Sequence, residues 1–172
     1  MTQMGHSLVG ASLGILALTK YKNLPSSLGT IFLFIFFANI PDLPIPLWGH
    51  DRYYFSHSLF ITIIVAILLV SVYLLFSKFW WKKAPDVKFL VLMVLALFSH
   101  LLLDSFYNHG FGVAIFWPLS SASLVLPIPW LSVQKELPPP FTLEMIKTWL
   151  LEFLTFSPLV LTALWFKMIK KH

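Results

Sequence analysis

The residues best suited to chemistry are His100 and Asp104, near the end of a long apolar run that begins around Val87. Residues four apart lie on one face of an α-helix, one turn from each other, so this imidazole and carboxylate can bind a metal ion from a single helix. An ionisable residue inside a lipid-embedded segment is costly and usually functional. Taken alone, the pair is equally consistent with a helix-capping aspartate and a hydrogen-bonded core histidine.

The composition indicates an integral membrane protein. The chain has 172 residues, of which 58% are hydrophobic and only 11% are charged, and its mean hydropathy is +0.83. These values lie far outside the range of soluble globular domains. The lysines occur in short clusters between apolar runs, as topology signals do, so the net charge of +5 does not indicate nucleic-acid binding. The absence of cysteine excludes disulfides, thiolate metal sites and a cysteine nucleophile.

The hydropathy pattern predicts an all-α bundle of about five transmembrane helices in a single domain, residues 1–172. The predicted helices are approximately 5–20, 27–40, 57–77, 87–107 and 146–167. Residues 41–56 are predicted to form a loop, because three prolines and Gly49 disfavour a regular element. Residues 108–141 are apolar but repeatedly broken by proline, so we expect irregular structure with short re-entrant or interfacial pieces there. The first apolar run has no basic region before it and is interpreted as a retained helix.

In a five-helix arrangement, most of the positive charge falls on one side of the membrane. The lysines that share this side are Lys20, Lys22, Lys78, Lys82, Lys83, Lys88, Lys167, Lys170 and Lys171. The other side retains only Arg52, Lys135 and Lys147. The positive-inside rule therefore predicts a multi-pass protein of the cytoplasmic (inner) membrane, with its N-terminus outside and its C-terminus in the cytoplasm.

This topology brings five ionisable residues from four helices to the outer end of the bundle. They are His6, Asp42, His57, His100 and Asp104. Zinc and similar divalent ions accept imidazole and carboxylate donors, so we expect a divalent metal ion here: zinc first, with manganese or iron as alternatives. Five ligands exceed the usual three of a mononuclear catalytic site, which leaves one or two ions open. The first two helices are short, ~22 Å against a hydrocarbon core of ~30 Å, so the site is expected near lipid headgroup depth.

Several short motifs resemble those of the membrane-bound metal-dependent hydrolases, a family of small multi-pass membrane proteins. The motifs are Gly5-His6 with Gly10, Pro41-Asp42, Ser56-His57-Ser58-Leu59, Ser99-His100-x-x-x-Asp104, and Gly112 followed by Trp117-Pro118. They cover roughly residues 4–130 and leave the last helix unmatched. The chain departs from the pattern at Pro44, where the family has a second aspartate. It departs again where Asp51-Arg52-Tyr53-Tyr54 replaces a His-Arg-Gly sequence.

The resemblance implies metal-dependent hydrolysis with the five residues above as ligands. Either Asp42 or Asp104 is alternatively the general base. The departures leave the number of ligands open, and the residues that could complete the set are Asp51, His50 and His109. Arg52 is the only arginine of the chain. It is a candidate to bind an anionic group of the substrate, with an interfacial anchor as an equally weighted alternative.

The predicted function is hydrolysis of a membrane lipid or lipid-linked substrate, a (phospho)ester, by a metal-activated water at the outer face. An ion or solute transporter is one alternative, although the inner halves of the helices carry almost no polar residues. A non-enzymatic membrane protein with a structural metal is the other. No nucleic-acid partner is expected, and the oligomeric state stays open. Glu152 lies inside the last apolar run; it either pairs with Lys147 or faces the bundle.

Overall fold

The protein is a bundle of helices. The computed structural model describes residues 2–18, 24–49, 53–81, 86–106, 112–126 and 143–169. Its long helices are α1 (Gln3–Ala17), α2 (Leu24–Asn39), α4 (Leu59–Phe76), α5 (Val87–Ser105) and α6 (Leu143–Ile169). The short ones are η1 (Ile40–Asp42), α3 (Tyr53–Ser56) and the π-helical η3 (Ser77–Trp81). Within the described residues, β-structure is limited to one isolated bridge between Val113 and Leu124. The all-α prediction is confirmed.

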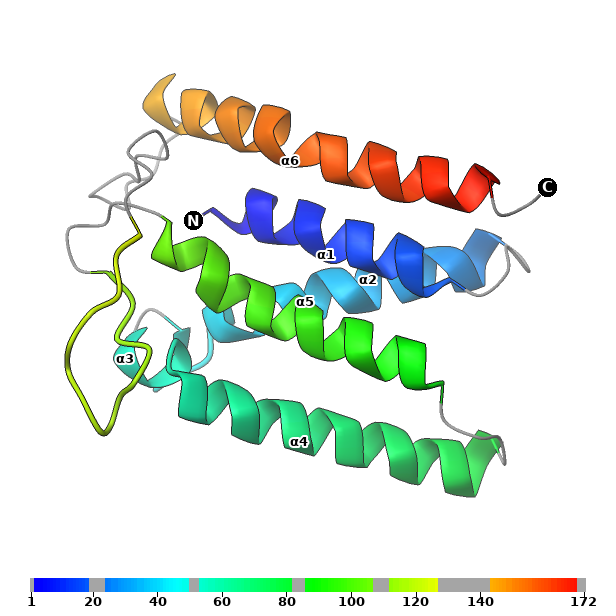
Figure 1. Cartoon of the computed structure of the whole chain (residues 1–172), viewed down its shortest axis with the longest axis horizontal. Coiled ribbons are helices and arrows are strands. Elements are labelled where there is room, and N and C mark those ends of the chain that lie inside the picture. Colours follow the sequence, from blue (N-terminus) through cyan, green and yellow to red (C-terminus); the bar gives the residue numbers. More distant parts are fainter. Residues whose placement is uncertain are drawn as a thin grey trace.

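Successive long helices run in alternating directions, so that α1 and α6 are parallel to each other (Figure 1). Helix α1 packs against α2, α5 and α6, and α5 packs against α1, α2 and α4. These two helices therefore each contact three of the other long helices. The main apolar core consists of Ala17, Phe34, Phe37, Ala38, Ile40, Ala66, Met93, Ala96 and Leu97.

Glycines in α1 allow α1 and α2 to approach each other closely. A Cβ atom at Gly10 would lie 2.7 Å from the carbonyl oxygen of Phe34, and one at Gly14 would lie 2.9 Å from the Cα atom of Ile31. Both distances are shorter than van der Waals contact. Only glycine at these two positions permits this crossing, an arrangement that is common between helices in membranes.

Three helices are long and apolar enough to cross a bilayer: Leu59–Phe79, Val87–Ser105 and Met145–Ile169. Their outer faces expose many large apolar side chains, as expected where lipid is the solvent. Helices α1 and α2 have 15 and 16 residues. At 1.5 Å per residue they extend about 22–24 Å, which is less than the ~30 Å of a typical hydrocarbon core. The structure therefore describes a membrane bundle in which α1 and α2 are shorter than a full span.

The prediction of an irregular loop over residues 41–56 missed two short helices, because η1 ends and α3 lies within this stretch. Pro41 lies at the start of η1, where its missing N–H has no partner to lose. The third predicted helix begins at Leu59 instead of residue 57. Ser58 is its N-cap, and the hydroxyl of Ser58 accepts a hydrogen bond of 3.3 Å from the N–H of Ile61.

The other helix ends lie within three residues of the prediction. The first predicted helix, 5–20, is observed at Gln3–Ala17; the second, 27–40, at Leu24–Asn39; the fourth, 87–107, at Val87–Ser105; and the last, 146–167, at Leu143–Ile169. Helix ends are set by local caps that hydropathy does not report. Asp86, for example, begins α5 by accepting a hydrogen bond of 3.2 Å from the N–H of Phe89.

The predicted irregular segment 108–141 is described over residues 112–126, where it forms turns and no helix. The carbonyl of Ile115 accepts a hydrogen bond of 2.8 Å from the N–H of Leu59, at the start of α4. The carbonyl of Ser105, at the end of α5, accepts one of 2.7 Å from the N–H of Leu126. These residues therefore pack over one end of the bundle, which is the end that carries the polar residues described next.

Candidate metal centre

The structure brings together all five of the residues that the sequence places at one end of the bundle. His6 lies in the first turn of α1, Asp42 ends η1, His57 lies between α3 and α4, and His100 and Asp104 lie near the end of α5. The three imidazoles are fully buried, Asp104 is 2% exposed and Asp42 is 6% exposed. Ionisable groups buried this deeply are paired or bind metals.

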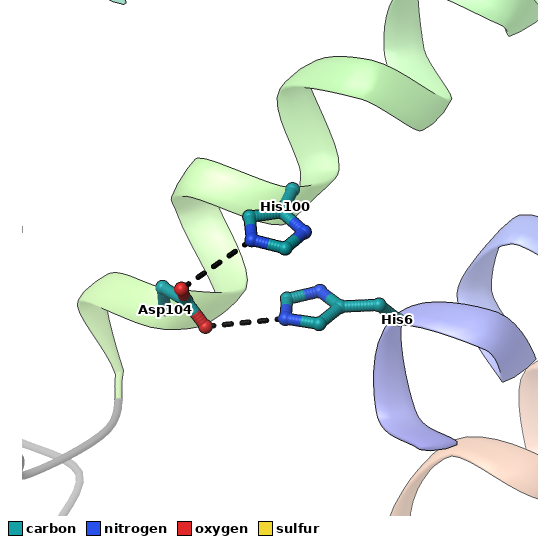
Figure 2. A group of neighbouring side chains, drawn as sticks. All are labelled: His6, His100 and Asp104. Atoms are coloured by element: carbon teal, nitrogen blue, oxygen red, sulfur yellow. Dashed lines mark ion pairs between the residues drawn. The ribbon is translucent and has the colours of Figure 1, made fainter. Parts of the chain in front are cut away.

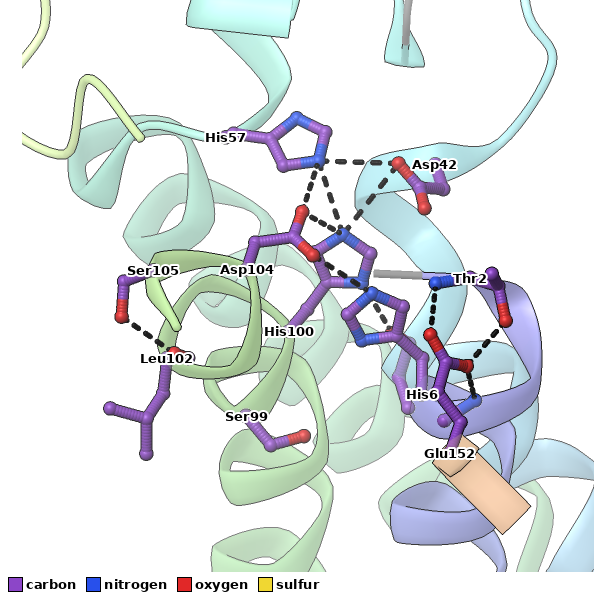
Figure 3. Close-up of polar contacts among 12 residues, drawn as sticks. Thr2, His6, Asp42, His57, Ser99, His100, Leu102, Asp104, Ser105 and Glu152 are labelled. Carbon is purple, nitrogen blue, oxygen red and sulfur yellow. Dashed lines mark hydrogen bonds and ion pairs between the residues drawn. The ribbon is translucent and has the colours of Figure 1, made fainter. Parts of the chain in front are cut away.

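The closest contact in the cluster joins two imidazole nitrogens: Nε2 of His57 lies 3.1 Å from Nε2 of His100 (Figure 3). Oδ1 of Asp42 lies 3.2 Å from the first nitrogen and 3.7 Å from the second. Oδ2 of Asp104 lies 3.3 Å and 3.5 Å from the same two nitrogens. The donor atoms therefore form two triangles that share the edge between the two histidines.

The Nδ1 nitrogens of His57 and His100 also have defined partners. Nδ1 of His100 lies 2.8 Å from the carbonyl oxygen of Ala38. A carbonyl only accepts hydrogen bonds, so Nδ1 carries the proton. Nδ1 of His57 lies 2.8 Å from Oγ of Ser56, whose hydroxyl donates to the carbonyl of Gly49 at 3.2 Å. Because this hydroxyl has only one proton to donate, Nδ1 of His57 is the donor to Ser56 and carries a proton too. When both rings are neutral, Nε2 keeps its lone pair, which is the arrangement that orients histidine for metal binding.

The Nε2 atoms of His57 and His100 thus lie 3.1 Å from each other and 3.2–3.7 Å from two carboxylate oxygens. With both nitrogens unprotonated, these atoms are all acceptors and repel unless a cation lies between them. Around a tetrahedral zinc ion with bonds of ~2.0–2.1 Å, neighbouring ligand atoms are about 3.3–3.4 Å apart. Each triangle has the dimensions of one face of such a tetrahedron. Two buried groups in the described residues could hold a metal ion: Asp42-His57-His100 and His6-His100-Asp104.

His6 contacts the other side of Asp104. Its Nε2 lies 3.2 Å from Oδ1 of Asp104, whereas His57 and His100 approach Oδ2. The ring of His6 stacks on the ring of His100, with centroids 3.7 Å apart and an angle of 12° between their planes (Figure 2). The two stacked rings therefore direct one nitrogen each to the two oxygens of a single carboxylate.

The loop that carries Asp42 is held in place by aromatic residues. The indole N–H of Trp48 donates a hydrogen bond of 2.7 Å to the carbonyl of Ile40. Phe55 makes edge contacts with Trp48 and with Trp117, at centroid distances of 5.7 Å in both cases. The Trp117-Pro118 motif thus belongs to the packing around the site.

Glu152 is the site-end residue whose role the sequence left open. Its side chain is fully buried on α6 and faces the bundle, whereas Lys147 is exposed. One carboxylate oxygen accepts hydrogen bonds from the N–H of Thr2 at 2.9 Å, and the other from the N–H of Gly5 at 3.0 Å and from the hydroxyl of Thr2 (Figure 3). The sequence showed Glu152 as an acidic residue in an apolar run, but it did not indicate which residues Glu152 contacts.

The opposite end of α1 is held by two lysines. Lys88 donates to the carbonyl of Leu16, and Lys167 donates to the carbonyl of Leu18. Cations favour the C-terminus of a helix and anions its N-terminus. Helix α1 is therefore bound at both ends by charges that match its dipole, and this fixes the helix that carries His6.

Buried ionisable residues within the described part of the chain all lie at the site end of the bundle. They are His6, Asp42, His57, His100, Asp104 and Glu152. A path for ions across the membrane would require polar groups along its full depth.

The sequence added four further candidate residues, and all of them lie outside the described residues: His50, Asp51, Arg52 and His109.

The comparisons with known proteins identify the family. A family model described as "YdjM inner membrane protein" matches residues 1–171, so the chain belongs to this family of inner membrane proteins. The match includes the last helix, which the motif resemblance had left out. No curated protein and no solved structure matches the chain.

Proposed function

We propose that this member of the YdjM inner membrane protein family is a metal-dependent hydrolase that cleaves a lipid-linked (phospho)ester. One observation carries the proposal: the Nε2 atoms of His57 and His100 face carboxylate oxygens of Asp42 and Asp104 in a buried cluster. A divalent cation explains why four acceptor atoms converge. Zinc is the first candidate because it takes nitrogen and oxygen ligands at these spacings, with manganese or iron as alternatives.

The chemistry follows from the donor set. A bound divalent ion lowers the pKa of its water to about 7 and polarises a phosphoryl or acyl oxygen. His57 and His100 would supply two nitrogen ligands, and one carboxylate would supply the third. The remaining carboxylate lies within reach as a general base, accepting the proton of the attacking water on its Oδ atom. Three protein ligands and one open position are the pattern of catalytic zinc sites.

The substrate class is inferred from the surroundings of the site. Its residues lie within about one turn of the ends of α1 and α5, and α1 and α2 are shorter than a bilayer core. A five-span arrangement with the N-terminus outside puts this end near the outer headgroups, where lipid phosphoesters reside. Arg52 would bind an anionic substrate group.

A structural metal is the second candidate function, and the burial of the site favours it. The three histidines are 0% exposed, and a structural ion typically sits in a closed set of protein ligands. In that case the ion would join α1, η1, the turn between α3 and α4, and α5 without catalysis. A transporter is disfavoured, because the buried ionisable groups in the described chain gather at one end.

Activity measurements on reconstituted protein test the hydrolase proposal. The full chain is placed in lipid nanodiscs, loaded with zinc or manganese, and incubated separately with phosphatidic acid, a polyprenyl diphosphate and a diacyl phospholipid. We expect metal-dependent release of phosphate or of a lipid fragment from one of them, and none from the Asp104→Asn variant. Retention of metal by the wild type without turnover of any of these substrates would favour the structural metal.

A further inference from the structure

The stacked pair of His6 and His100 indicates more than one metal position. We propose that the centre holds two divalent ions, and that the Asp104 carboxylate bridges them. The first ion is bound by Nε2 of His57 and His100, and the second by Nε2 of His6. This inference rests on the proposed function, because it presumes that the first position binds metal.

The spacing of the rings sets the spacing of the ions. The His6 and His100 rings are nearly parallel, at 12°, with centroids 3.7 Å apart. Their Nε2 atoms point at the same carboxylate, because each lies 3.2–3.5 Å from one of its oxygens (Figure 2). Ions bound in the planes of two parallel rings are separated by roughly the ring spacing. Two-metal hydrolytic sites hold their ions about 3.5–4 Å apart.

Asp104 is positioned to serve both ions. Its Oδ1 is directed to Nε2 of His6, and its Oδ2 is directed to the nitrogens of His57 and His100. A carboxylate that presents different oxygens to two groups of nitrogen ligands has the geometry of a bridge. If the only ion lay among Asp42, His57 and His100, the fully buried imidazole of His6 would keep its contact with Asp104 but have no hydrogen bond at either ring nitrogen, and burial of a group paired so incompletely is costly.

The two positions differ in how many protein ligands they have. Nδ1 of His100 is bound to the carbonyl of Ala38, so this histidine has only Nε2 available and serves one ion. The first position then has His57, His100 and the bridge as ligands, which leaves Asp42 as the carboxylate within reach as the general base. Among the described residues, the second has His6 and the bridge, and its remaining positions would take water and a phosphoryl oxygen. We therefore assign substrate binding to the ion on His6, and the substrate class to phosphoesters, which two-metal centres clamp on both reacting oxygens.

Metal stoichiometry and electron paramagnetic resonance test the two-ion centre. The full-length protein is stripped of metal, titrated with Mn²⁺ and measured beside His6→Gln, which keeps most of the side-chain volume. We expect two ions per chain and an exchange-coupled manganese signal in the wild type. The variant should bind one ion, with the spectrum of an isolated Mn²⁺. The ion retained by the variant also shows that it is folded.

Each contrary outcome identifies what has failed. One ion per chain in both proteins would overturn the second position and leave the proposed function standing. No ion in either protein would overturn the proposed function together with the second position. Two ions with uncoupled spectra in the wild type would overturn the bridging role of Asp104. Loss of both ions in His6→Gln, with unchanged helix content, would overturn the assignment of His6 to a separate ion.

Discussion

The carboxylate of Glu152, on the last helix, accepts a hydrogen bond of 3.0 Å from the backbone N–H of Gly5, on the first helix. The residue after Gly5 is His6, so this contact joins α6 directly to the turn that presents a candidate metal ligand. The first N–H groups of a helix have no partner within the helix and are satisfied from outside. In this chain the partner is a buried carboxylate that lies 147 residues further along the chain.

Removing the charge of Glu152 should destabilise the protein. Glu152→Gln keeps one oxygen acceptor but loses the second and its charge, leaving buried N–H groups of α1 poorly paired. Hydrogen bonds to charged groups contribute about 1.5–3 kcal/mol each, so we expect a loss of about 2 kcal/mol in the free energy of unfolding. Thermal denaturation in detergent measures it. Thr155→Val is the matched control on the same helix, because Thr155 is exposed and its hydroxyl donates a hydrogen bond to the carbonyl of Leu151 within α6. Equal melting temperatures for the two variants would contradict the capping role.

Ser56 and Ser58 flank His57 but should act differently. Ser56 orients the ring of His57, and loss of such an outer partner lowers metal affinity by about 10–100-fold. Ser58 is the N-cap of α4, and loss of a cap reduces stability by about 1 kcal/mol. Zinc titration should therefore give a raised dissociation constant for Ser56→Ala and an unchanged one for Ser58→Ala. The reverse pattern would show that the tautomer argument is wrong.

The close crossing of α1 and α2 predicts opposite effects at two glycines. Gly10→Ala introduces a Cβ atom 2.7 Å from the carbonyl of Phe34, and overpacking of this kind destabilises by about 1–3 kcal/mol. A Cβ atom at Gly29 meets nothing within 4 Å. Gly29→Ala should instead stabilise α2 by up to about 1 kcal/mol, because alanine loses less backbone entropy in a helix. Denaturation curves of the two variants compare them directly, and equal stability would refute the crossing.

Much of the fold could be predicted from hydropathy, because a bilayer demands long apolar helices. The same pattern identified His6, Asp42, His57, His100 and Asp104, since ionisable residues are conspicuous in apolar runs. Helix ends were less accurate. They depend on single caps such as Ser58, and on Pro41, which begins a short helix where the sequence suggested only a loop.

The arrangement of the ligands could not be predicted, because it depends on contacts between distant residues. Nothing in the sequence indicates that Asp104 presents one oxygen to His6 and the other to His57. The role of Glu152 was out of reach for the same reason: its partners Thr2 and Gly5 lie at the far end of the chain. Tertiary packing decides both.

The most direct test of the metal centre is the metal content of the purified full-length protein, measured by mass spectrometry in the wild type, Asp104→Asn and Asp86→Asn. Asp86 caps the opposite end of the same helix, and asparagine is an equally good cap, so this variant controls for the chemical change. We predict at least one zinc, manganese or iron ion per chain in the wild type and in Asp86→Asn, and a near-complete loss in Asp104→Asn. Absence of metal from the wild type after incubation with these ions would contradict the account, and the cluster would then be a set of ion pairs between protonated histidines and aspartates that packs the helices together.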